Sequence, residues 1–220
     1  MKPHFFCVSI ADSIYYDHQP RRQTNLMTRP LFLALTLVTT LSLLSGCLIV
    51  ETKEYHITMK SGGTGEARIV FNDIQSETDD TIDVSKADFD QLIDLYMHGS
   101  QLERDNPGYR NVVKHLYEKN GKLCGDISFS FDSLAVMRLF QYESDGPFMY
   151  FVGSPLSSEV MMETNGTYGR DWMPIVFWPS GTKELYIKTR VVSQGSYHRP
   201  LLALFKSWEQ TPQAKEKLNK

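Results

Sequence analysis

The stretch YHITMKSGGTGEARIVF, residues 55–71, decides the fold of this chain. Apolar and polar residues alternate on both sides of its centre, which is the pattern of β-strands with one buried face. The centre, residues 61–65, holds three glycines, and glycine tolerates the positive φ angles of tight turns. The stretch therefore predicts an antiparallel hairpin. A phosphate-binding loop is disfavoured because no Gly-Lys-Ser/Thr follows and no helix pattern begins there.

The rest of the domain repeats this pattern. Asn120-Gly121 is a two-residue turn signal between alternating runs, and a further hairpin is expected around the turn residues Ser144 to Pro147. The apolar run 173–179 contains two prolines, which predicts an edge strand or a buried loop because proline cannot donate to a strand ladder. Strands or hairpins are expected over residues 112–118, 122–132, 141–153 and 183–192.

Two amphipathic helices are expected between the strands. The first begins at Ser85, which forms a capping-box spacing with Asp88, and it ends at Gly99. The second begins at Pro200. Each helix has one apolar stripe at helical spacing: Phe89, Leu92, Ile93, Tyr96 and Met97 in the first, and Leu201, Leu204, Phe205 and Trp208 in the second. The expected fold class is α+β, an antiparallel sheet of hairpins packed against two amphipathic helices.

The segment before this domain has the layout of a secretory signal peptide. Arg29 precedes an apolar run over residues 31–44, and the run closes on Leu44-Ser45-Gly46-Cys47. This tetrapeptide resembles the lipobox of bacterial lipoproteins. The resemblance implies recognition of Leu44, Ser45 and Gly46 by a signal peptidase, cleavage just before Cys47, and a diacylglycerol on the Cys47 thiol.

The resemblance divides the chain into four parts. Residues 1–46 form the signal peptide region, with Met27 as the expected true start, and residues 47–53 form the lipidated N-terminus and a short tether. Residues 54–209 form a single α+β domain, and residues 210–220 form a polar tail. The alternative is a plain membrane helix over residues 31–50. Hydroxyl and small residues interrupt that run, and its apolar part reaches about 21 Å as a helix, against a bilayer core of ~30 Å.

The lipoprotein resemblance also predicts a location. The chain is expected in the bacterial cell envelope, held to the bilayer by acyl chains on Cys47. Leu48 follows the cysteine, and in Gram-negative sorting this residue is more compatible with the outer membrane than an aspartate would be. The formal net charge of −3 with no basic cluster argues against nucleic-acid binding and against electrostatic docking on anionic lipid.

Cysteines and acidic residues give no sign of a disulfide, a metal or a cofactor. Of the three cysteines, Cys7 lies in the signal region and Cys47 would carry lipid, which leaves Cys124 as a buried, inert thiol. The acidic loop over residues 75–83 lacks the spacing of a calcium loop. Asp94 and His98 are one helical turn apart, and a solvated charge pair is the favoured interpretation.

Function is the least determined property of the sequence. It contains no nucleophile elbow, zinc-protease motif, Cys-x-x-Cys or phosphate-binding loop, which favours a non-catalytic protein. Aromatic residues gather in the second half, either as a large core or as an apolar ligand pocket. The favoured function is a binding or envelope-interaction module with an unknown envelope protein as partner. A carrier of lipid or another small apolar ligand and a hydrolase with a dispersed site are the alternatives. The candidate ligand-binding residues are Phe148, Tyr150, Phe177 and Trp178.

Overall fold

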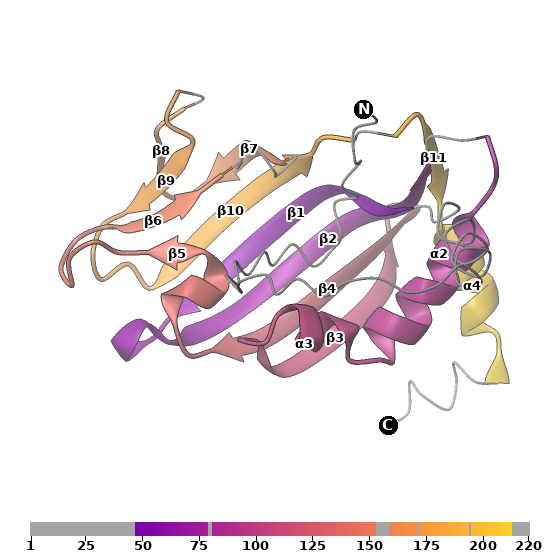
Figure 1. Cartoon of the computed structure of the whole chain (residues 1–220), viewed down its shortest axis with the longest axis horizontal. Helices are drawn as coiled ribbons and strands as arrows, with labels where there is room; N and C mark the ends of the chain where they lie inside the picture. The colour runs from indigo at the N-terminus through magenta and orange to yellow at the C-terminus, as the bar shows by residue number, and fades with distance from the viewer. Residues whose placement is uncertain (1–46, 79–80, 153–158, 171, 194, 213–220) are drawn as a thin grey trace, which may run out of the picture.

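The computed structural model describes residues 47–78, 81–152, 159–170, 172–193 and 195–212 (Figure 1). Antiparallel strands form two sheets, which confirms a mixed α+β class dominated by antiparallel sheet. The large sheet has the order β3-β4-β2-β1-β10-β7, with β11 also paired to β2, and the small sheet has the order β5-β6-β9-β8. The strands of the large sheet are β1 (Cys47–Met59), β2 (Gly65–Thr78), β3 (Arg110–Lys119), β4 (Lys122–Phe131), β7 (Glu159–Thr164), β10 (Glu184–Val191) and β11 (Tyr197–Pro200). Those of the small sheet are β5 (Leu139–Phe140), β6 (Phe148–Phe151), β8 (Thr167–Tyr168) and β9 (Ile175–Trp178).

The predicted hairpin is the centre of the large sheet. Strands β1 and β2 pair from Cys47 opposite Glu77 to Met59 opposite Gly65, and a short 3-10 turn, η1 (Ser61–Gly63), joins them. Gly65 has to be a glycine, because a Cβ there would lie 2.4 Å from the Thr58 carbonyl oxygen. The Asn120-Gly121 turn is also confirmed: both residues have positive φ, as a two-residue hairpin turn requires.

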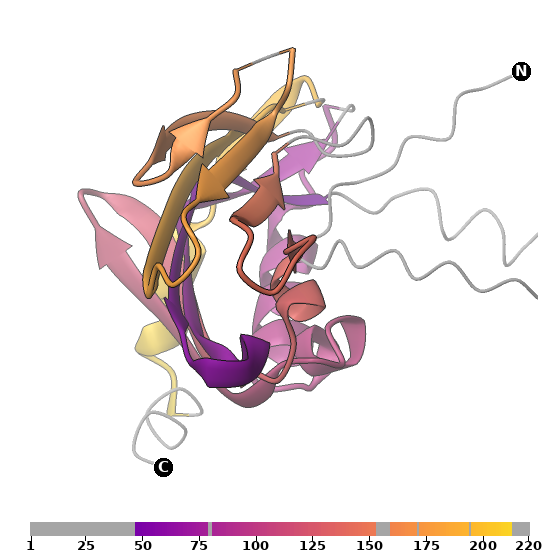
Figure 2. The same ribbon diagram turned by 90° about the vertical axis from the view of Figure 1, so that its left-hand side faces the viewer.

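The large sheet has one buried and one solvent-facing side, as the alternation predicts. Ile57 on β1 lies beside Ala67 on β2 and Leu185 on β10, and all three side chains are buried. Figure 2 shows that the sheet is curved and that α2 (Ser85–Gln91), α3 (Gln101–Asp105) and strand β5 lie on the same side of it. This inner side carries the core, and the opposite, outer side carries most of the polar strand residues.

The helices follow the predicted stripes with local differences. After α2 the chain continues as a π-helix, η2 (Leu92–Met97), and Phe89, Leu92 and Ile93 are buried. Helix α4 (Leu202–Glu209) lies next to α2 in Figure 1 and buries Phe205. A short 3-10 helix, η3 (Leu134–Met137), precedes β5. Among the described residues, no helix is long and apolar enough to cross a membrane.

The structure corrects the prediction of a tether. The sequence predicts a short tether over residues 47–53, but they form the first half of β1 and pair with β2 from Cys47 onward. Leu48, Ile49 and Val50 are all buried, which explains why this apolar segment does not remain free in solvent. The folded domain therefore includes residues 47–53.

Three further local predictions are wrong. The run expected as an edge strand is β9, an inner strand between β6 and β8; its prolines, Pro174 and Pro179, lie just outside the strand and so remove no ladder donor. The capping box is absent: Val84 is the N-cap of α2, and the buried Asp88 carboxylate instead accepts a hydrogen bond from Ser76 of β2. Likewise, Pro200 ends β11 and does not begin the last helix.

Candidate functional site

The outer side of the large sheet carries a polar groove. The strand register places Arg68 of β2 between His56 of β1 and Ser128 of β4. One step along the strands, Glu66 lies between Thr58 and Ser130. These two rows and the neighbouring part of β3 enclose a groove of about 420 Å³. Hydroxyl, imidazole, guanidinium and carboxylate groups therefore face one shared space open to solvent.

A buried carboxylate fixes the cationic group of this groove. Arg68 Nη2 lies 2.9 Å from Asp126 Oδ2, and His115 Nδ1 lies 3.2 Å from Asp126 Oδ1. The Asp126 side chain is only 7% exposed, whereas that of Arg68 is 52% exposed. Burial alone would raise the pKa of Asp126, but the hydrogen bonds and charges of Arg68 and His115 outweigh it and lower the pKa. An ionised Asp126 thus orients Arg68, which keeps N–H donors available for a ligand.

The Asp126–His115 pair resembles part of a catalytic arrangement, but its third member is not in place. A nucleophile would have to hydrogen-bond the second ring nitrogen of His115. Within the described parts of the chain, the His115 ring hydrogen-bonds only Asp126. Ser128 of the groove lies opposite Val113, two positions before His115 on β3. The geometry suits binding and orientation of a polar group better than nucleophilic attack.

A second cluster joins a serine, a histidine and a glutamate beside the start of β1. Ser193 Oγ lies 2.8 Å from His198 Nε2 and donates a hydrogen bond to the Glu77 carboxylate. The Gly195 amide also donates to Glu77, at 2.7 Å. In a catalytic triad the carboxylate holds Nδ1, on the opposite side of the ring from the nucleophile. Here the Glu77 carboxylate contacts the Ser193 hydroxyl itself and lies 3.8 Å from His198 Nε2, so the three residues do not form a triad. Their hydrogen bonds instead attach the loop after β10 to strand β2.

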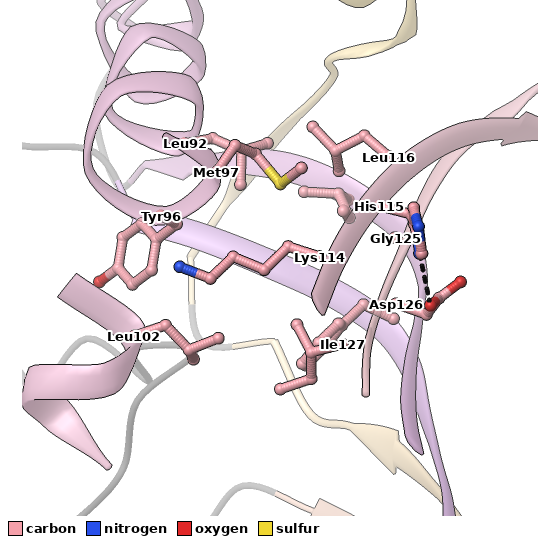
Figure 3. A pocket seen from close by; sticks show the side chains of 12 residues that line it. Leu92, Tyr96, Met97, Leu102, Lys114, His115, Leu116, Gly125, Asp126 and Ile127 are labelled. Carbon is pink, nitrogen blue, oxygen red and sulfur yellow. Dashed lines mark hydrogen bonds and ion pairs between the residues drawn. The ribbon is translucent and has the colours of Figure 1, made fainter. Parts of the chain in front are cut away.

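A small apolar pocket lies beneath the π-helix on the inner side of the sheet (Figure 3). Leu92, Tyr96 and Met97 of η2 line it together with residues of α3 and strands β2, β3 and β4. The Lys114 ammonium lies at its edge, where it bonds the Gly99 carbonyl at 3.0 Å and Glu103 at 2.8 Å. Its volume is about 40 Å³, far below the ~300–1,000 Å³ of ordinary ligand sites. This pocket holds little more than a few waters.

The four aromatic candidates for ligand binding lie in the small sheet, and neither of these two cavities includes them. Trp178 and Tyr150 are buried, and Phe148, opposite Trp178, shares their face of the sheet. Phe177 pairs with Met149 and therefore points to the other face. Trp178 Nε1 donates a 2.7 Å hydrogen bond to Asn165. Trp178 and Tyr150 thus form part of the core, and a ligand-binding role of the four residues stays a prediction.

A buried ion pair links β1 to the edge strand β7 on the inner side. Lys53 Nζ lies 2.8 Å from Glu159 Oε1, and both side chains are about one-tenth exposed. Thr189 Oγ1 donates to the same carboxylate at 2.6 Å, and the Tyr55 hydroxyl lies 3.3 Å away. Burial alone would raise the pKa of Glu159, but the charge and hydrogen bond of Lys53 and the bond from Thr189 lower it overall. This cluster stabilises the sheet, because Lys53 and Glu159 neutralise each other where both are buried.

The remaining sequence predictions have these places in the structure. Leu44, Ser45, Gly46 and the rest of the signal region lie outside the described residues, as does most of the polar tail. Cys124 is a buried free thiol in β4. In the described part of the chain, no three histidine, cysteine, aspartate or glutamate residues gather as a metal site. Comparison with protein-family models, curated proteins and solved structures finds no match, so the site is argued from this chain's geometry.

Sequence reasoning missed the groove because its residues come from four strands. The alternation in β2 and β4 places Arg68, Ser128 and Ser130 on a solvent side, and this signal is present in the sequence. Their neighbours across the sheet depend on which strands pair and in which register. The contact between Arg68 and Asp126, 58 positions apart, has no local signal.

The Lys53–Glu159 pair makes a prediction about stability and pH. Glu159→Gln should lower the free energy of unfolding by about 3–5 kcal/mol at neutral pH, because Lys53 is then buried without its anion. The lowered pKa of Glu159 means that its contribution is present above the pKa of the unfolded chain and is lost as pH falls through the folded pKa. The difference between the two proteins should therefore shrink below about pH 4.

Urea unfolding of the purified protein across the acid range measures this difference. Asp90→Asn is the matched control, because its partner Lys86 is 70% exposed and the pair is a surface contact. That control should change stability by less than about 0.5 kcal/mol. A Glu159→Gln protein as stable as the wild type at neutral pH contradicts the assigned role.

Proposed function

We propose that this chain is an exported, lipid-anchored binding module of a bacterial cell envelope. In this proposal acyl chains on Cys47 hold it to the membrane, and the outer membrane is favoured in a Gram-negative cell. A sheet of hairpins, closed by two amphipathic helices, presents the polar groove to a partner. The observation that carries the binding role is the 420 Å³ groove, whose volume falls in the range of ordinary ligand sites.

The sequence Leu44-Ser45-Gly46-Cys47 supports the anchor, because it has the lipobox pattern. Cleavage before Cys47 would leave the pairing of β1 with β2 intact from its first residue. At about 0.8 kcal/mol per buried methylene, two or three acyl chains would hold the protein far more firmly than one.

The chemistry of the groove indicates a polar partner. Arg68 offers a cation that Asp126 orients, and the hydroxyls of Thr58, Ser128 and Ser130 can each donate and accept hydrogen bonds. Such a set recognises a polar segment of an envelope partner. The apolar pocket beneath η2, with a volume of about 40 Å³, is itself too small for a lipid chain.

The anchor is tested by the mass of the protein recovered from its native membrane fraction. We expect a chain that begins at Cys47 and carries diacylglyceryl mass. The modification should disappear in Cys47→Ala, because that variant has no thiol to receive it. An unmodified chain that retains residues 31–50 would contradict the anchor and restore the membrane helix as the explanation.

The groove is tested by photo-crosslinking in intact cells. Benzoylphenylalanine in place of Val113, which lines the groove and is 50% exposed, should give a discrete adduct. The same group in place of Tyr142, which is 91% exposed between β5 and β6, should not give this adduct.

Arg68→Ala, in the protein that carries benzoylphenylalanine at position 113, should reduce the adduct at least about tenfold, because the loss of a charged hydrogen-bond donor costs about 1.5–3 kcal/mol. Arg104→Ala, on α3, is the matched loss of an exposed arginine and should leave the yield unchanged. Equal yields from Arg68→Ala and Arg104→Ala would contradict the proposal that the groove binds a partner.

A further inference from the structure

Strand β11 brings an exposed aromatic residue to the end of the sheet where β1 begins. Glu77 of β2 pairs with Cys47 of β1 on one side and with His198 of β11 on the other. Tyr197, next to His198, therefore lies about two strand spacings, roughly 10 Å, from Cys47 along the sheet. The side chain of Tyr197 is 42% exposed.

Two loops add to the same end. Arg199 of β11 donates a 3.0 Å hydrogen bond to the Thr81 carbonyl, which places the neighbouring Ile82 beside β11. Ser193 bonds Glu77, which places the neighbouring Val192 beside the end of β2. Ile82 is 48% exposed and Val192 is 45% exposed. In Figure 1 the start of β1, the end of β10 and β11 lie on the upper side of the molecule, near the label N.

We propose that this end, defined by Ile82, Val192 and Tyr197, is a membrane-docking surface that rests directly on the lipid bilayer. The inference rests on the proposed lipid anchor at Cys47. Because β1 is paired from Cys47 onward, no loose segment separates an acylated Cys47 from the fold. Acyl chains there would bring this end to the bilayer interface, and exposed apolar side chains would gain contact with its apolar region.

The charges at this end are compatible with a lipid surface. The Glu77 carboxylate accepts hydrogen bonds from Ser193 Oγ and the Gly195 amide. Asp83 lies 3.4 Å from Arg199 Nε and accepts hydrogen bonds from the Ser85 amide and hydroxyl. Because these carboxylates already have partners, they oppose a close approach to lipid less than unpaired carboxylates would.

The test measures depth with a fluorescent label. Single-cysteine variants Ile82→Cys, Val192→Cys and Tyr197→Cys are made in a Cys124→Ala background and labelled with bimane. The full acylated protein is placed in phosphatidylcholine–phosphatidylglycerol vesicles that carry nitroxide on the acyl chains. Tyr142→Cys is the matched control, since the connection between β5 and β6 lies at the opposite end of the molecule in Figure 1.

We expect the nitroxide to quench the three labels at least about twofold more than the label at position 142, as contact with the interfacial region requires. Mass analysis of each sample separates the two possible failures. If the protein is acylated and quenching is equal at all four positions, the proposed docking surface is wrong and the lipid anchor is still supported. A chain without lipid on Cys47 overturns the anchor and, with it, this inference.

Discussion

The pairing of β1 with β2 and β10 is the constraint on which the rest of the structure depends. Its register places Tyr55 and Ile57 on the inner side and His56 and Thr58 on the outer side. A slip by one residue would exchange these two sets, since side chains alternate along a strand. The core would then receive polar groups, and the groove would lose His56. Both the fold and the proposed binding surface thus follow from one register.

The same register explains the buried ion pair between Lys53 and Glu159. Lys53 lies two and four positions before Tyr55 and Ile57, so its side chain points to the same inner side. The alternation along β1 therefore directs an ammonium toward the core. Glu159 offsets the cost of burying this charge, with further hydrogen bonds from Thr189. Edge strand β7 brings Glu159 there through its pairing with β10. The pair therefore ties an edge of the sheet to its centre.

Local patterns predicted much of the fold and little of the site. Alternation and Asn120-Gly121 identified the main hairpins, because a turn and its two flanking strands are neighbours in sequence. The contact of β1 with β10 joins residues more than 120 positions apart and has no such signal. The prediction of a tether over residues 48–50 is wrong for the same reason: their backbone partners lie in β2, about 25 positions further along the chain.

The proposed anchor and groove would lie far apart on one rigid strand. His56 and Thr58 follow Cys47 by roughly ten residues along β1, a distance of about 30 Å at the rise of an extended strand. A fold that rests on the bilayer at Cys47 would therefore hold the groove well away from the membrane. This separation suits a module that is anchored at one end and meets a partner at the other.

The continuity of β1 is the central claim, and hydrogen exchange of the full protein tests it directly. Over residues 48–50 the described partner of β1 is β2, so every second amide there bonds a neighbouring strand. The strand pairing predicts that these bonded amides exchange slowly, like those of residues 55–58 in the same strand. Fast exchange of every amide over residues 48–50, beside slow exchange at residues 55–58, would contradict it. The anchor would then be joined to the domain by a flexible tether, and the fixed distance between membrane and groove would be lost.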